Sequence, residues 1–339
     1  MARRRLLAAL LAAAVALAAC GGDDDDSGSG ADEPSGTSEI SADFKSALAQ
    51  ASSPKKSDFP APAGRSLRAL ADSMQAGGQI GLASSVFTPG ENRLAFGLID
   101  DENKLIYGKA AVYVAAKPTD QAQGPFLAPA DSLVTEGRFR SQTAAAETDT
   151  IAAIYEASIP LEKPGSVAIL AVVDVGDGQQ FAMATSIEVQ REDPVVSVGE
   201  QAPDIETDTI ASLGGNEELA STREPIDKDL HDVSLDEVLG ERPVALLMAT
   251  PQLCQTRVCG PVVDIAVQLK QEYGDRVEFI HQEVYEDNDP SKGLRKPLRE
   301  FGLATEPWLF TIDRSGRVAA RLEGSFGIEG FREAVEAAL

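Results

Sequence analysis

The sequence is poor in the residues from which most catalytic and metal sites are built. Its 339 residues include only 3 cysteines, 2 histidines and 1 tryptophan. Residues 79–191 contain neither histidine nor cysteine, and their carboxylates are scattered. We therefore expect a binding or spacer role for that region and look for chemistry elsewhere.

Basic residues are also scarce. The chain has 30 Lys and Arg against 54 Asp and Glu, a formal net charge of −24. Such a surface repels the phosphate backbone, so we exclude nucleic acid as a partner. With this length and 43% hydrophobic residues, the chain has room for two hydrophobic cores.

No run at the N-terminus is long enough to span a membrane. Residues 1–20 consist of Arg3-Arg4-Arg5, the short apolar run Leu6–Leu17, and Leu17-Ala18-Ala19-Cys20. This is the pattern of a secretory signal, and its end resembles the bacterial lipobox. The resemblance implies cleavage before Cys20 and lipidation of its sulfur. We expect a lipid anchor on the extracytoplasmic face of a bacterial cell membrane; an ordinary signal peptide with a chance cysteine is the alternative.

Two segments without a core of their own should follow the signal. Residues 21–38 are rich in Gly, Asp and Ser, which predicts a disordered acidic tether. Its aspartate run lacks the ligand spacing of a calcium loop. Residues 39–78 are helical or irregular, with helices predicted over Ser41–Gln50 and Gly64–Gln75 on either side of a proline-rich break.

Residues 79–191 alternate polar and apolar side chains between turn residues, which predicts an all-β sandwich of immunoglobulin type. Loosely, the region resembles small sandwich domains of bacterial envelope proteins, in fold only. The predicted strands are Ile80–Phe87, Arg93–Asp100, Ala110–Ala116, Thr150–Ile159, Ser166–Val173 and Gln180–Val189. Arg191–Ser197 should be a hinge into a second domain.

Residues 198–339 alternate strands with helices and predict an α/β domain. Asp204–Asp229 is acidic and should be a surface excursion. The predicted elements after it are strand Pro243–Met248, a helix from Pro261, strand Val277–Glu283, a helix near Pro297–Phe301, strand Leu309–Ile312, a hairpin through Arg314-Ser315-Gly316 and helix Ile328–Leu339.

Two cysteines lie at the turn between the first of these strands and its helix. Pro261 suits the first helical position, which puts Cys259 beside the unpaired N–H groups of the helix start. A thiolate is favoured there, and the neighbouring Arg257 acts in the same direction. We therefore expect a lowered pKa for Cys259, with Cys254 five positions upstream.

These residues carry a family resemblance. The strand, Cys259-Gly260-Pro261 and the amphipathic helix resemble the active-site turn of the thioredoxin-like superfamily. Thr305-Glu306-Pro307-Trp308 is similar to its cis-proline turn, and Val198–Asp204 and Ser234–Leu239 resemble the redoxin and thiol-specific antioxidant branch. The resemblance implies a thioredoxin-like fold over residues 198–339. It also implies a cis peptide before Pro307 that faces the cysteines.

The chain departs from the family pattern at several positions. Val262 stands where thioredoxins carry their second cysteine, so the pair is C-x4-C. Glu306 places a carboxylate near the presumed thiol, which should raise its pKa. Thr256 is three residues before Cys259, as in peroxiredoxins, but Pro251 is one residue too far upstream for that signature.

Our sequence-based hypothesis is thiol–disulfide exchange with a protein thiol or disulfide partner. Cys259 would attack, Cys254 would resolve the mixed disulfide and Pro307 would shape the substrate groove, with Arg257, Thr256, Glu306 and Trp308 lining it or tuning the thiol. No cofactor beyond this redox-active disulfide is expected. A non-catalytic binding protein with a structural Cys254–Cys259 disulfide, which persists outside the cytoplasm, is one alternative. A peroxidase using the same nucleophile is another.

The histidines give no clear metal site. His281 shares a face of its strand with Glu283 and could approach the cysteine turn. Copper chaperones of the same superfamily use C-x3-C with a distant downstream histidine, which this chain lacks. We therefore predict a core or surface histidine and no metal. His231 has no partner that the sequence reveals.

Overall fold

The computed structural model describes residues 42–142, 151–254 and 258–339. Predictions on the signal sequence, the tether, Cys20, Thr256 and Arg257 lie outside these residues. No helix in the described part of the chain is both long enough and apolar enough to cross a bilayer. The described residues form one unit by their contacts.

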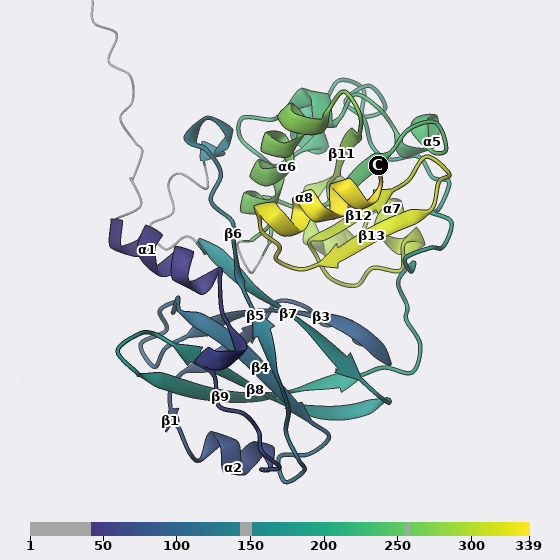
Figure 1. Ribbon diagram of the computed structural model, residues 1–339. Coiled ribbons are helices and arrows are strands. Elements are labelled where there is room, and N and C mark those ends of the chain that lie inside the picture. The colour runs from purple at the N-terminus through teal and green to yellow at the C-terminus, as the bar shows by residue number, and fades with distance from the viewer. Residues whose placement is uncertain (1–41, 143–150, 255–257) are drawn as a thin grey trace, which may run out of the picture. The chain divides into compact units, whose positions relative to one another are not determined.

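The first part of this unit is a sandwich of two sheets (Figure 1). One sheet has the order β2-β3-β7-β6 and the other β1-β9-β8-β4-β5. The strands are β1 Gln75–Ala76, β2 Gln79–Leu82, β3 Gly90–Ile99, β4 Lys109–Ala115, β5 Gln123–Ala128, β6 Ala130–Ser132, β7 Ala153–Leu161, β8 Gly165–Asp174 and β9 Gln180–Val189. Helices α1 (Ala42–Ala51) and α2 (Leu67–Ala71) precede them.

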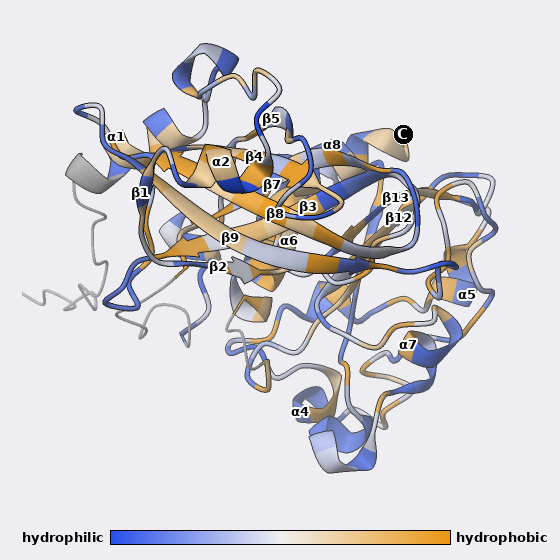
Figure 2. Ribbon diagram, turned by 90° about the horizontal axis from the view of Figure 1, so that it is seen from below, coloured by the Kyte–Doolittle hydropathy of each residue, from blue (hydrophilic) through white to orange (hydrophobic). Residues whose placement is uncertain are grey.

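The sandwich follows from the period-two pattern. Alternate residues of β3, such as Leu94 and Phe96, face the other sheet and are fully buried, because successive side chains of a strand point to opposite faces. Phe96 stacks on Tyr155 of β7 with ring centroids 5.6 Å apart. In Figure 2 strands such as β8 are mostly orange, while α4 and α7 are largely blue. The predicted two-layer sandwich is therefore present, and its immunoglobulin-type connection stays a prediction.

Three strands of the sandwich, β1, β5 and β6, were not predicted, and β1 begins at Gln75, where the helix Gly64–Gln75 was expected to end. β5 contains Pro125, and Pro129 lies between β5 and β6. Proline cannot donate to a ladder, so a run containing it does not look like a strand. β5 accommodates Pro125 because it lies at the edge of its sheet.

The second part is an α/β layer around a four-stranded sheet of order β11-β10-β12-β13. β10 pairs in parallel with β11 and antiparallel with β12, which pairs antiparallel with β13. The elements are α4 Glu217–Ala220, α5 Leu235–Val238, β10 Val244–Met248, α6 Cys259–Tyr273, β11 Glu278–Gln282, α7 Lys296–Glu300, β12 Trp308–Ile312, β13 Val318–Glu323 and α8 Ile328–Ala337. From β10 onward this is the β-α-β-α-β-β-α order of a thioredoxin-like fold.

Each face of this sheet has its own core. Ala245 and Leu247 of β10 face α6 and α8, whereas Leu246 and Met248 face α5 and α7. All four are almost completely buried. Because β10 is covered on both faces, all of its residues are apolar, which explains the continuous apolar run in the sequence. Both cysteines lie in the core with α6 and α8.

The outer face of the sheet β2-β3-β7-β6 packs on this same core. Ala95 of β3 and Ile154 of β7 belong to it. Polar contacts join the two parts as well: the Glu323 carboxylate accepts from the backbone N–H groups of Ser85 and Val86, each at 2.9 Å. Arg93 donates to the carbonyl oxygen of Glu323 at 2.8 Å. The predicted domain boundary at Arg191–Ser197 follows β9 and stays a prediction.

The expectation that Asp204–Asp229 is a surface excursion is wrong for much of that segment. Ile205, Thr207, Ala220, Ser221 and Arg223 are buried. Thr207 accepts from the N–H of Leu235 through Oγ1, and its own N–H donates to Ser234 Oγ, both at 2.9 Å. The segment thus completes the N-terminus of α5, a tertiary role that its acidic composition does not reveal.

Candidate functional site

The two cysteines lie side by side at the N-terminus of α6. The helix begins at Cys259, two residues earlier than predicted, and Pro261 is its third residue. Proline is tolerated there because first-turn N–H groups have no acceptor within the helix. Cys259 is completely buried and Cys254 is 8% exposed. Both are thiols in this structure, and Cys254 is close enough to Cys259 to raise its pKa.

The expectation of a lowered pKa for Cys259 is wrong. Burial raises the pKa of Cys259 well above its ordinary value, and the hydrogen bond and charge of Cys254 raise it further. The backbone N–H of Thr250 lowers this pKa, and the Glu306 carboxylate raises it. Loss of hydration therefore outweighs the stabilisation that the start of a helix offers an anion. The sequence could show the helix start but not the depth of burial.

Glu306 lies where the family resemblance placed it. The Glu306–Pro307 peptide is cis, and the side chain is partly buried. Burial raises the pKa of Glu306, and the charge of Cys254 raises it further. The Tyr285 hydroxyl donates to Glu306 Oε1 at 3.4 Å. Burial is the largest cause that raises the pKa of Tyr285 to about 12, and the charge and hydrogen bond of Glu306 are the next largest. Tyr285 was not singled out in the sequence, because no spacing links it to the cysteines.

Trp308 lies on the other side of the sheet from the thiols. It belongs to the core beneath α5 and α7 and stacks on Phe310 with ring centroids 5.7 Å apart. Its indole N–H donates to Thr305 Oγ1 at 3.0 Å, and that hydroxyl donates to Glu323 Oε1 at 3.0 Å. The structure therefore places Trp308 in the packing beneath the proline turn. The carbonyl of Pro307 accepts from the N–H of Gly324 at 2.8 Å, which ties the turn to the end of β13.

The two histidines meet in the interior. His281 of β11 is completely buried, so it is a core histidine, and its Nε2 is 2.9 Å from the carbonyl oxygen of Ala249. A carbonyl only accepts, so Nε2 carries the proton and Nδ1 of the neutral ring accepts. Nδ1 lies 3.3 Å from Nε2 of His231, which therefore donates. Burial is the main cause that lowers the pKa of both rings, that of His231 to about 2.

One peptide group connects this histidine pair with the nucleophile candidate. Its oxygen, on Ala249, accepts from His281. Its N–H, on Thr250, is close enough to the Cys259 thiol to lower the pKa of that thiol. Hydrogen bonds in series polarise one another, so the imidazole strengthens the N–H that faces the sulfur. Sequence periodicity placed His281 on a strand near the turn but could not show this link.

A buried ion pair also holds α6 in place. Arg223 Nε donates to Asp264 Oδ1 at 2.9 Å, and both side chains are at most 5% exposed. The backbone N–H of Ser141 donates to Asp264 Oδ2 at 3.0 Å, and Arg223 Nη2 donates to the carbonyl of Phe139 at 2.7 Å. Three segments far apart in sequence therefore converge on one helix position. Within residues 42–142, 151–254 and 258–339, no three metal-ligating side chains converge to hold a metal ion.

Comparisons with known proteins give the following. No protein-family model matches the chain, and no curated protein sequence matches it. One similar solved structure is a provisionally assigned thiol:disulfide interchange protein DsbE from Chlorobium tepidum, with 17% identity and a TM-score of 0.31, covering 42% of this chain and 98% of that one. Another is a thiol:disulfide interchange protein of the thioredoxin family from Chlorobium tepidum TLS, with 16% identity and a TM-score of 0.29, covering 41% and 94%.

Proposed function

We propose that this chain is a thiol–disulfide oxidoreductase whose redox pair is Cys254 and Cys259, held outside the cytoplasm by a lipid on Cys20. One observation carries the proposal. Two thiols of one buried core lie together at the start of α6, near the Glu306–Pro307 peptide of a β-α-β-α-β-β-α layer. A pair of neighbouring thiols is the reduced form of a disulfide.

The exchange takes place in two balanced steps. The Cys259 thiol loses its proton to the Glu306 carboxylate, and its sulfur attacks one sulfur of the partner's disulfide. A mixed disulfide forms, and the partner's second sulfur leaves as a thiolate. The Cys254 sulfur then attacks Cys259 as its proton passes to the departing sulfur, which closes the internal disulfide and releases the partner's first sulfur as a thiol. The partner gains two electrons and the cysteine pair loses them.

The raised pKa of Cys259 bears on the direction of exchange. A dithiol whose reduced form is stabilised as a thiolate is a strong oxidant. Here burial and Glu306 oppose the thiolate, so the reduced pair gains no such stabilisation. We therefore propose that the chain acts as a reductant toward its partner.

The second candidate is a non-catalytic binding protein with a structural disulfide. The burial of both cysteines favours it, because inert structural cysteines are buried in apolar surroundings. In that case both serine substitutions would lower thermal stability about equally, and neither would trap a partner. Structural disulfides also have reduction potentials below about −300 mV, whereas catalytic ones are higher.

The test compares single serine variants of the full chain in its native membrane. Cys254→Ser should accumulate a mixed disulfide between Cys259 and a partner protein, visible as a reducible band on a gel. Cys259→Ser should accumulate none, and the double variant is the control. Absence of the band together with a potential below about −300 mV would reject the enzyme in favour of the structural disulfide.

The proposed anchor is tested separately. Cys20→Ser removes the sulfur that would carry the lipid, so the protein should move from the membrane fraction to the soluble extracytoplasmic fraction. Ser27→Cys in the Cys20→Ser background is a control for the position of the thiol. An unchanged membrane fraction of Cys20→Ser would reject the anchor without affecting the redox proposal.

A further inference from the structure

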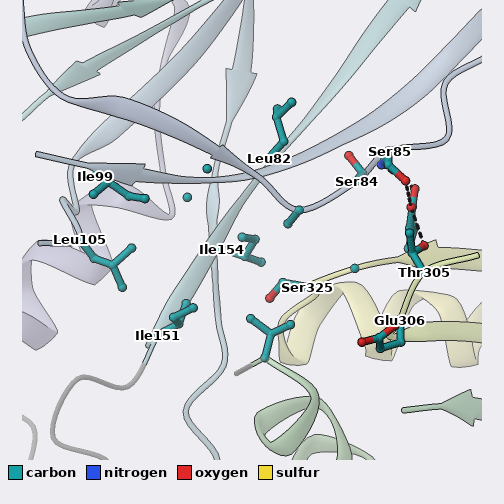
Figure 3. Close-up of a pocket in the computed structure, with 16 residues that line it drawn as sticks. Leu82, Ser84, Ser85, Ile99, Leu105, Ile151, Ile154, Thr305, Glu306 and Ser325 are labelled. Atoms are coloured by element: carbon teal, nitrogen blue, oxygen red, sulfur yellow. Dashed lines mark hydrogen bonds between the residues drawn. The ribbon is translucent and has the colours of Figure 1, made fainter. Parts of the chain in front are cut away.

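A cavity of about 420 Å³ lies beside the thiol site. One wall is the outer face of β2 and β3, and another is formed by Val258, Thr305 and Glu306 with Gly324 and Ser325 (Figure 3). A thioredoxin-like layer alone does not form this space, because more than half of its lining residues come from the sandwich. Its volume falls in the range of ordinary ligand pockets.

The hollow exists because the sandwich presents very small residues at this place. Gly81 of β2 pairs with Gly97 of β3, so both point to the same face of the sheet. A Cβ on Gly97 would meet only Leu105 Cδ2, at 3.6 Å, which is ordinary van der Waals contact. The rim around this gap is aliphatic: Ile99, Leu105, Ile151 and Ile154 line it.

The cavity also has polar groups at its other end. Ser325 lines it and is completely buried, yet its hydroxyl has no hydrogen-bond partner among the described residues. In Figure 3 this hydroxyl is turned toward the side where Ile151 lies. Glu306 also lines the cavity, and among the described residues it accepts one hydrogen bond, the long one of 3.4 Å from the Tyr285 hydroxyl. Glu323, by contrast, already accepts from Ser85, Val86 and Thr305.

The polar end adjoins the reacting atoms. Val258 lines the cavity and precedes Cys259 in the chain. Glu306 lines it too and is close enough to raise the pKa of Cys259. A group that fills the aliphatic hollow is therefore held against Val258 and Glu306, the cavity residues nearest to Cys259. Leu82, one of the few exposed large hydrophobic residues among those described, extends the apolar surface at the rim.

We propose that this cavity binds the aliphatic residue beside the reactive cysteine of a polypeptide substrate, an inference that rests on the proposed function and adds its substrate class. The side chain enters between Gly97 and the isoleucines. Glu306 accepts a backbone N–H or a basic side chain of the substrate, and Ser325 donates to a backbone carbonyl. An acidic neighbour is rejected by Glu306 and by the net charge of −24.

The test uses peptides that cannot react. Four fluorescein-labelled hexapeptides carry Ser in place of Cys and Leu, Ser, Lys or Asp at the next position. Their binding to the full chain is measured by fluorescence anisotropy. The leucine peptide should bind about tenfold more tightly than the serine peptide, as expected for burying one aliphatic side chain, and the aspartate peptide most weakly.

A cavity-filling variant locates the binding. Gly97→Val places a β-branched side chain in the hollow without backbone strain, and should remove most of the tenfold preference for leucine. Ala184→Val, at an exposed position of β9 in the other sheet, is the matched control and should retain the preference. The wild-type peptide series alone decides the question if Gly97→Val does not fold.

The outcomes separate this inference from the function it rests on. Equal binding of all four peptides, or an unchanged preference in folded Gly97→Val, overturns the inference. Displacement of an apolar dye from the cavity by decanol but by no peptide also overturns it, because the occupant is then a small amphiphile. Exchange with oxidised glutathione is measured in parallel. Exchange without peptide selectivity leaves the proposed function standing, and selectivity without exchange rejects that function instead.

Discussion

Nε2 of His231 lies 3.3 Å from Nδ1 of His281, and both rings are buried in the interior. The positive charges of Lys270 and Arg295 disfavour a protonated His231. Those of Arg223 and Arg295 disfavour a protonated His281, whereas the Glu283 carboxylate favours it. Both imidazoles are therefore neutral at pH 7. The pair supports the Ala249–Thr250 peptide, and its protonation should disturb both stability and the thiol site.

The first prediction concerns the stability of this pair against acid. The folded-state pKa of His231, about 2, is below its ordinary value of 6.5, so between these values only the unfolded chain binds the proton. The free energy of unfolding should therefore fall as pH decreases below 6.5, by up to about 1.4 kcal/mol per pH unit for each histidine. His231→Gln removes one of the two histidines, so it should reduce this slope by up to about 1.4 kcal/mol per pH unit. Urea unfolding between pH 7.5 and pH 5 measures it, and parallel curves for the two proteins would contradict the assignment.

The second prediction concerns the reactivity of Cys259. Because burial raises its pKa, alkylation by iodoacetamide should be slow at pH 7 and should accelerate above pH 9. Glu306→Gln removes a charge that opposes the thiolate, so it should shift this pH profile to lower pH. Glu300→Gln, exposed on α7, is the control and should leave the profile unchanged. A fast reaction at pH 7 in the wild type would mean that the thiol is not desolvated.

The third prediction concerns the buried ion pair of Arg223 and Asp264. Removing one partner leaves the other charge buried and unpaired, so Asp264→Asn or Arg223→Met should lower the free energy of unfolding by about 3–5 kcal/mol. The exposed pair of Lys104 and Glu102 is the control, because Lys104→Met should cost at most about 1 kcal/mol. Thermal and urea unfolding give both values. Equal costs at the two pairs would contradict the packing seen around α6.

The fourth prediction concerns the contact between the sandwich and the α/β layer. A protease site inserted at the predicted boundary Arg191–Ser197 should allow cleavage into two folded pieces. The Glu323 contacts with Ser85 and Val86 should keep these pieces together on gel filtration. Glu323→Ala removes the charged acceptor of these part-buried hydrogen bonds, each worth about 1.5–3 kcal/mol, and should let the pieces separate. Pieces that unfold on cleavage would contradict the boundary.

Much of the fold could be predicted from local pattern. The alternation in β3, β7 and β8 and the continuous apolar run of β10 identified their strands, and the segments predicted for α6 and α8 are helical. The pattern failed at β5, where Pro125 obscures an edge strand, and at Asp204–Asp229, where acidic residues border buried ones. In both cases the neighbouring elements decided the structure.

By itself, the sequence singled out Cys259 and Glu306, because Cys259-Gly260-Pro261 and Glu306-Pro307 are local motifs between well-marked strands and helices. It did not reveal Tyr285, and it expected Trp308 in the site although that side chain packs on the other side of the sheet. Only the tertiary structure decided the electrostatic state of that site. Hydration depends on what covers an atom, and the atoms that cover Cys259 come from distant segments. Its raised pKa, the meeting of His231 with His281 and the cavity formed by Gly97 all result from this long-range packing. The periodic pattern of residues along the chain does not show which distant segments pack together.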